Sequence, residues 1–117
     1  MNIPDICVLK FSASWCGPCK AISPYIEELK KEYPTVKVIE IDADENQELC
    51  KKYTITKLPS FVFLNKTEKK TIVGIDKTTL NLNFIRTYKA MNSNQIEMFD
   101  IPEDQTARVN VSNSKEK

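Results

Sequence analysis

The sequence predicts a three-layer α/β/α sandwich built on a mixed sheet, and three observations lead to that organisation. Short apolar runs alternate with segments of helical periodicity in the order strand, helix, strand, helix, hairpin, helix. A length of 117 residues with 41% hydrophobic residues suits one domain with a single modest core. After Met91 the composition turns polar, so we divide the chain into a domain at 1–91 and a polar tail at 92–117.

The first element is a continuous apolar run at residues 6–9, which is typical of a central strand buried on both faces. We expect Lys10 to end that strand. Apolar residues at helical spacing predict a helix from about Pro18 to Tyr33, with Pro24 as a kink inside it. A strand is expected at 36–41, followed by a short helix at 44–53 that Asp44 or Asn46 caps. Two further strands at 61–64 and 71–73 are joined by a polar connection at 65–70, and a last helix, entered after Lys77-Thr78, covers 80–91.

The stretch from Trp15 to Lys20 reads Trp-Cys-Gly-Pro-Cys-Lys and puts two thiols one helical turn apart. Residues three apart at a helix start lie about 5–6 Å from each other, within the Cα separation that a disulfide needs, so Cys16 and Cys19 can form a reversible disulfide. Unpaired backbone N–H groups and the positive end of the helix dipole stabilise a thiolate at a helix start, as does a nearby cation such as Lys20. We therefore expect Cys16 to be the nucleophile and Cys19 the resolving thiol.

The residues around the thiols suit the same chemistry. Pro18 fits the first helical turn, where a backbone N–H would have no partner, and Gly17 lets the backbone of another chain come close. Trp15 directly precedes the nucleophile, where its ring can cover the site and stack on a partner chain; core filling is the alternative. Pro59 follows Leu58 at the start of a predicted strand, one of the places where a sheet accepts proline.

The stretch 15–20 resembles the active site of the thioredoxin family, whose motif is the same W-C-G-P-C-K. The resemblance covers roughly residues 6–91 with consistent spacing and includes, outside the motif, Phe11, Pro24, Asp42, Asp44, Leu58-Pro59-Ser60-Phe61 and Val73-Gly74. It implies a thioredoxin-like sandwich that is shortened at its N-terminus, because the family's first strand and helix have no counterpart ahead of Ile6.

The resemblance implies a thiol–disulfide oxidoreductase that reduces disulfide-containing protein substrates through Cys16 and Cys19. It also implies an electron donor of the thioredoxin-reductase or glutathione type, and a part in electron transport and cell redox homeostasis. We expect no cofactor and no metal. The runner-up function is a redox-weak binding module that uses the same groove to hold a protein.

The same resemblance describes how a substrate would be held. It implies a cis peptide bond before Pro59, which aims the backbone of Leu58 at a substrate strand; a trans proline in an ordinary turn is the alternative. The apolar docking surface would then comprise Gly17, Pro18, Leu58, Pro59, Gly74 and Ile75.

Lys10 departs from the family pattern. Thioredoxins carry a buried aspartate at this position, directly before Phe11, where it is thought to move a proton to and from the resolving cysteine. A buried ammonium is costly without a partner, and Glu40 on the neighbouring strand could pair with Lys10 and supply the carboxylate, which makes the two residues candidates for proton relay or for tuning the thiol pKa. Alternatively, Lys10 extends its ammonium to the water at the rim.

Composition excludes several other classes of protein. The net charge of +1 offers no basic field for nucleic acid or an anionic membrane, and the chain has no histidine for imidazole catalysis or a Cys/His zinc site. The apolar run near the N-terminus is too short for a signal-peptide core. We therefore expect a cytoplasmic protein in which Cys7 and Cys50, each inside an apolar-patterned segment, are buried free thiols.

The two ends of the chain are expected to be connected. Without the family's first strand, the strand at 36–41 would leave an unpaired sheet edge. The tail holds one alternating run at 108–112, which has the period of a half-covered strand. Three outcomes stay open: a disordered tail, docking of 107–112 on that edge, or pairing of two edges in a dimer, with a monomer favoured over the dimer.

Overall fold

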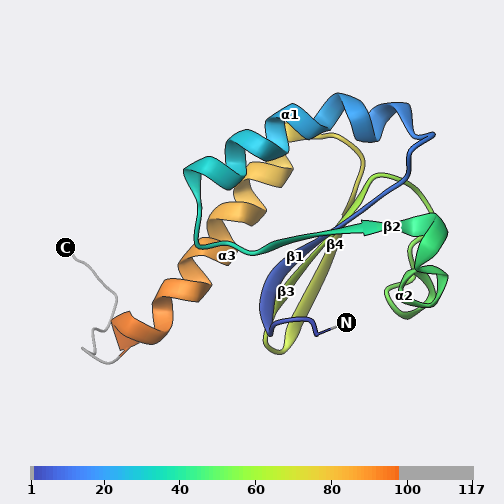
Figure 1. Cartoon of the computed structure of the whole chain (residues 1–117). Helices are drawn as coiled ribbons and strands as arrows, with labels where there is room; N and C mark the ends of the chain where they lie inside the picture. Colours follow the sequence, from blue (N-terminus) through green and yellow to red (C-terminus); the bar gives the residue numbers. More distant parts are fainter. Residues whose placement is uncertain (1, 98–117) are drawn as a thin grey trace.

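The computed structural model describes residues 2–97, in which helices enclose a central sheet from both sides (Figure 1). Every predicted strand and helix is present. In chain order, the elements are β1 (Ile6–Ser12), α1 (Gly17–Glu32), β2 (Val38–Asp42), the 3₁₀ helix η1 (Ala43–Glu45), α2 (Gln47–Lys52), β3 (Ser60–Asn65), β4 (Glu68–Val73) and α3 (Lys77–Glu97).

The sheet has four strands in the order β2-β1-β3-β4. β1 runs parallel to β2 and antiparallel to β3, and β3 pairs antiparallel with β4, so the sheet is mixed as predicted. Within residues 2–97, β2 has no strand on its outer side, which agrees with the edge expected at 36–41. The alternating run at 108–112 lies outside the described residues.

Each face of the sheet carries its own apolar cluster, because strand side chains point alternately to the two faces. The cluster under α1 and α3 contains Val8, Ile22, Ile26, Leu29, Val36, Phe61, Phe63, Leu80 and Phe84. The cluster on the opposite face, where α2 packs, contains Cys7, Leu9, Phe11, Ile41, Tyr53 and Val62. With α1 and α3 on one side of the sheet and α2 on the other, the predicted three layers are confirmed (Figure 1).

β1 extends beyond its apolar run, so the expectation that Lys10 ends this strand was wrong. Lys10 is in register with Glu40 of β2 and Phe61 of β3, and β1 continues to Ser12. A strand flanked on both sides has partners for both rows of its backbone groups, and this pairing outweighs the polarity of one side chain. Lys10 is consequently buried in the sheet, with 4% of its surface exposed.

The hairpin is tighter than predicted, because the connection expected at 65–70 shrinks to two residues. Asn65 and Glu68 already pair with each other, which makes β4 start at Glu68. Lys66 has a φ of 54°, the left-handed conformation that two-residue hairpin turns require.

α3 extends beyond its predicted end at Met91, into the first residues of the segment 92–117 that we assigned to the polar tail. The helix continues to Glu97, and residues 92–97 contain no proline or glycine to stop it. Each residue added to an existing helix gains a backbone hydrogen bond, so a polar segment can prolong it. Neither α3 nor another helix within residues 2–97 is long and apolar enough to cross a membrane.

Candidate active site

The start of α1 brings the two motif thiols together. Cys16 is the N-cap residue, and its Sγ accepts a hydrogen bond from the backbone N–H of Cys19 at 3.1 Å. The Cα atoms of the two cysteines are 5.3 Å apart, and their sulfur atoms form a disulfide. Pro18 lies in the first turn of the helix, where its missing N–H removes no helical hydrogen bond.

Electrostatics distinguish the two thiols, whereas burial does not. The exposed fraction is 4% for Cys16 and 3% for Cys19. After reduction, the backbone N–H of Cys19 and the positive end of α1 both favour a thiolate on Cys16. Cys19 is the third residue of α1 and donates its backbone N–H to Cys16, whereas Cys16 at the cap accepts that hydrogen bond. This arrangement suits attack by Cys16 and resolution by Cys19.

A second part of the chain adjoins the disulfide. Leu58 packs against the cluster that contains both motif cysteines. The Leu58–Pro59 peptide bond is cis, and the Pro59 carbonyl accepts a hydrogen bond from the N–H of Gly74 at 2.9 Å. The fold therefore brings together segments around residues 16, 58 and 74. We use the name docking surface for the residues that the sequence analysis predicted to contact a partner chain, which are the six named there together with Trp15: Trp15, Gly17, Pro18, Leu58, Pro59, Gly74 and Ile75.

The docking surface has an exposed rim and a buried floor. Trp15 is 67% exposed and Ile75 is 48% exposed. Pro59 is buried, next to the half-buried Leu58 and Gly74. Large apolar side chains that are exposed beside a buried disulfide suit contact with another protein chain.

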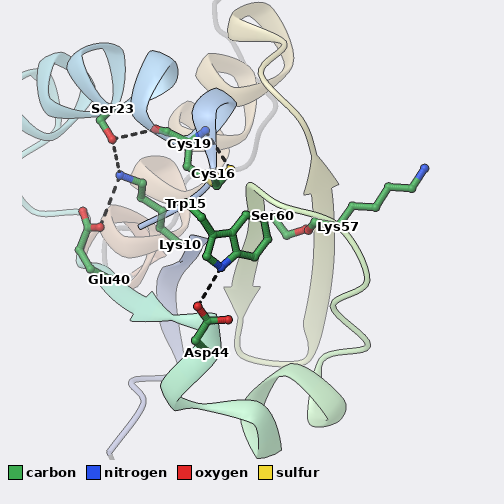
Figure 2. Close-up of a disulfide and its surroundings, with 9 residues drawn as sticks. All are labelled: Lys10, Trp15, Cys16, Cys19, Ser23, Glu40, Asp44, Lys57 and Ser60. Carbon is green, nitrogen blue, oxygen red and sulfur yellow. Dashed lines mark hydrogen bonds and ion pairs between the residues drawn. A yellow bond between two sulfur atoms is a disulfide. The ribbon is translucent and has the colours of Figure 1, made fainter. Parts of the chain in front are cut away.

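Trp15 is held by a residue that the sequence analysis did not connect with it. The indole N–H of Trp15 donates to Oδ2 of Asp44 at 2.8 Å (Figure 2). Asp44 does not cap α2; Asn46 occupies that N-cap position, but its side chain donates to the carbonyl of Asp42 instead of capping the helix. The two bonded residues are 29 positions apart, so no local spacing could have revealed the contact.

Lys10 forms an ion pair with Glu40, which was one of the two alternatives expected. Its side chain does not extend to the water at the rim, which was the other alternative. Its Nζ lies 3.4 Å from Oε1 of Glu40, and the side chain of Lys10 is 5% exposed. Nζ also donates to Oγ of Ser23 at 3.0 Å, and Ser23 Oγ donates to the carbonyl of Cys19 at 2.9 Å (Figure 2). The sequence analysis missed Ser23, although its spacing of four from Cys19 on a helix was the available signal.

The other two cysteines are free thiols, as predicted, but of the two only Cys7 is buried. Cys7 is completely buried, and desolvation raises the pKa of its thiol to about 11. Cys50 is half-buried, and its thiol pKa is raised by desolvation and then by the charge of Asp44. A thiolate is the reactive form of cysteine, so neither residue has the environment of a nucleophile.

Comparisons with known proteins agree with this geometry. A family model described as Thioredoxin matches residues 2–87. Thioredoxin H-type of Fagopyrum esculentum is 42% identical over 74 residues, which cover 62% of this chain and 64% of that protein, slightly under two thirds of its length. Thioredoxin 1 of Plasmodium falciparum is 37% identical over 87 residues, which cover 74% of this chain and 83% of that protein. The solved structure of Fasciola hepatica thioredoxin is similar with a TM-score of 0.66 and 37% identity, covering 70% of this chain and 80% of that one.

Proposed function

The chain belongs to the thioredoxin family of thiol–disulfide oxidoreductases, and we propose that it reduces disulfide bonds in other proteins through Cys16 and Cys19. The observation that carries this proposal is the Cys16–Cys19 disulfide at the start of α1, beside an exposed apolar surface. A disulfide that only braced the fold would need neither a helix start that stabilises a thiolate nor such a surface.

The reaction passes two electrons from the dithiol to the substrate. The Cys16 thiolate attacks one sulfur of the substrate disulfide and breaks the S–S bond, which forms a mixed disulfide and releases a thiolate that takes a proton from solvent. Cys19 then loses its proton and attacks the Cys16 sulfur. The bond to the substrate breaks, the second substrate sulfur is protonated, and the Cys16–Cys19 disulfide is the product.

The docking surface holds the substrate during these steps. An extended substrate strand can pair with the backbone of Leu58, and pairing of this kind recognises a strand largely independently of its side chains. The exposed rings and chains of Trp15 and Ile75 then contact the residues that flank the substrate cysteine. Because backbone pairing and apolar contacts both tolerate many substrate sequences, we expect broad recognition of disulfide-containing proteins.

Renewed turnover requires an electron donor outside this chain, and we infer a thioredoxin-reductase-like or glutathione-type partner. We propose that the protein takes part in electron transport and cell redox homeostasis. This role suits a reducing compartment, and we propose the cytoplasm. The unpaired thiols of Cys7 and Cys50 are compatible with a reducing environment. We propose a monomer as the working form.

Trapping of mixed disulfides tests the roles of the thiols. Cys19→Ser leaves Cys16 able to attack but removes resolution, so this variant should accumulate disulfide-linked partners. Cys16→Ser should trap few, and Cys50→Ser is the matched control because it removes a thiol outside the motif. Equal trapping by the Cys16 and Cys19 variants, or trapping that depends on Cys50, would overturn the assignment.

A redox-weak binding module is the second candidate, and Lys10 at the position of the family's aspartate is the observation that favours it. Reduction of insulin by dithiothreitol, measured with and without the protein, separates the two functions. Faster precipitation of insulin supports the reductase. Binding of disulfide-containing proteins without any acceleration supports the binding module.

A further inference from the structure

We propose that Lys10 is a positioning residue for the resolving step, in which its buried ammonium stabilises the thiolate of Cys19. This inference rests on the proposed reductase function and replaces the proton-carrying acid of the family with a fixed positive charge. Ser23 links the ammonium to the first turn of α1, and Glu40 holds it in place.

The hydrogen bonds lead from the charge to the resolving cysteine. Lys10 Nζ donates to Ser23 Oγ at 3.0 Å, and Ser23 Oγ donates to the carbonyl of Cys19 at 2.9 Å. Figure 2 shows the amine of Lys10 between Glu40 and Ser23, on the α1 side of β1. These bonds end at the backbone carbonyl of Cys19, and Cys19 lines the same cavity as Lys10 and Ser23, so the ammonium favours a negative charge on the Cys19 thiol.

Glu40 weakens this positive charge only in part. The side chain of Glu40 is 48% exposed, so water screens its carboxylate, whereas the Lys10 side chain is 5% exposed. The second carboxylate oxygen of Glu40 also lies 4.0 Å from Nζ of Lys30 on α1, which divides its attraction between two ammonium groups. The Lys10 ammonium is therefore less screened than its partner carboxylate, in a cavity that Cys19 also lines.

An open cavity of about 370 Å³ connects this cluster with solvent. Its ionisable lining groups come from three elements: Lys10 of β1, Cys19 and Lys20 of α1, and Glu40 and Asp42 of β2. Of these charged groups, the Lys10 ammonium is the buried one, because Lys20, Glu40 and Asp42 are exposed. β3 contributes no lining residue to this cavity, so no further ionisable group faces Lys10 from that side.

The resolving step balances without another reactant. In the mixed disulfide, the Cys19 thiol releases its proton to water in the cavity, and the electron pair left on sulfur attacks Cys16 Sγ. The bond between Cys16 and the substrate breaks, and the substrate sulfur leaves with the bonding pair and takes a proton from solvent. Lys10 transfers no proton in this step and supplies charge only.

The test uses 5,5′-dithiobis(2-nitrobenzoate) on the reduced full chain carrying Cys50→Ser, which removes the more accessible non-motif thiol. The first release of thionitrobenzoate reports attack by Cys16, and the second release reports resolution by Cys19. The pH midpoint is the pH at which the rate of the second release is half-maximal. In Lys10→Met this midpoint should rise by about one pH unit, which corresponds to a tenfold smaller fraction of Cys19 thiolate at a given pH. A more basic thiolate is also more nucleophilic. The rate of the second release in Lys10→Met at neutral pH should therefore fall only about threefold.

Three further variants separate charge from structure. Lys10→Arg should keep the midpoint, because it retains the positive charge, and Lys31→Met is the matched control that removes an exposed ammonium from α1. Glu40→Gln should shift the midpoint in the opposite direction to Lys10→Met, since it exposes Cys19 to the full ammonium charge. This variant also keeps the test open if Lys10→Met does not fold.

The outcomes of the test are distinct for the two proposals. A second release whose midpoint is the same in the parent, Lys10→Met and Glu40→Gln overturns the role of Lys10 and leaves the reductase intact. Failure of the parent to show a first release that depends on Cys16 contradicts the proposed function itself. Midpoints that move in opposite directions in Lys10→Met and Glu40→Gln support the inference.

Discussion

The two faces of β1 carry different chemistry, although the same strand builds both. On the face toward α2, Cys7, Leu9 and Phe11 are all fully buried in one apolar cluster. The opposite face changes along the strand, from Val8 in the core to Lys10 and Ser12 at the cavity beside the motif. Because successive side chains point to opposite faces, one strand can complete a core and also begin a polar site.

The cysteines follow the same division. Cys7 on the apolar face has lost contact with water, and its thiol pKa is about 11. Cys16 and Cys19 lie where β1 leads into α1; Cys16 Sγ accepts a backbone N–H, and Cys19 lines the same cavity as the buried Lys10. Reactivity is thus a property of the position and not of the residue type.

The largest effect expected from this comparison is a difference in thiol reactivity. At neutral pH a thiol with a pKa near 11 is only about 0.01% thiolate, against about 1% for a cysteine with the ordinary pKa of 9.0. Iodoacetamide should therefore modify Cys16 of the reduced protein at least about a hundredfold faster than Cys7, as measured by peptide mass spectrometry. Similar rates at the two residues would contradict the contrast between the faces of β1.

Stability at alkaline pH should report the burial of Cys7. The folded-state pKa of about 11 lies above the ordinary value of 9.0, so folding favours the protonated thiol. The contribution of Cys7 to stability is complete below about pH 9 and is lost as pH rises towards 11, by roughly 2–3 kcal/mol. Urea unfolding of Cys7→Ala should show a shallower decline over this range than the parent, because every other ionisable group is present in both proteins. An identical slope would exclude this role for Cys7.

A smaller effect is expected from the ion pair on the polar face. Lys10 and Glu40 should show a coupling energy of about 1 kcal/mol in a double-mutant cycle with Lys10→Met and Glu40→Gln, less than for a fully buried pair because Glu40 is half-exposed. Lys10→Asp should lower the free energy of unfolding more than Lys10→Met or Glu40→Gln, because it places two carboxylates next to each other. Changing Glu40 as well should relieve this repulsion. Chemical unfolding measures all these values, and a coupling energy of zero would rule out a stabilising pair.

The smallest effect concerns the docking surface, beyond the end of β1. Asp44→Asn weakens the acceptor for the indole of Trp15 without removing a side chain. The hydrogen bond is exposed, so its loss is worth about 0.5 kcal/mol and should lower the rate of insulin reduction only about twofold. Glu45→Gln removes the next carboxylate along η1 and is the control, and an equal loss in both variants would show that charge, not the position of the ring, is responsible.

Much of the fold was predictable because its signals are local. The apolar run of β1, the helical spacing of α1 and the spacing of three between Cys16 and Cys19 each depend on neighbouring residues. The exact ends were less predictable: α3 passes residue 91 and reaches Glu97, because an existing helix needs no apolar signal to continue.

The sequence by itself determined the motif, the order of elements and the pair of thiols that form the disulfide. Only the tertiary structure decided that Lys10 pairs with Glu40 and Ser23, and that Asp44 binds Trp15. These contacts join residues that are 13 to 30 positions apart, and they form only after β1 and β2 pair in register and α1 packs on the sheet. Spacing along the chain encodes contacts within one element, whereas the partner of a buried charge depends on which elements the sheet brings together.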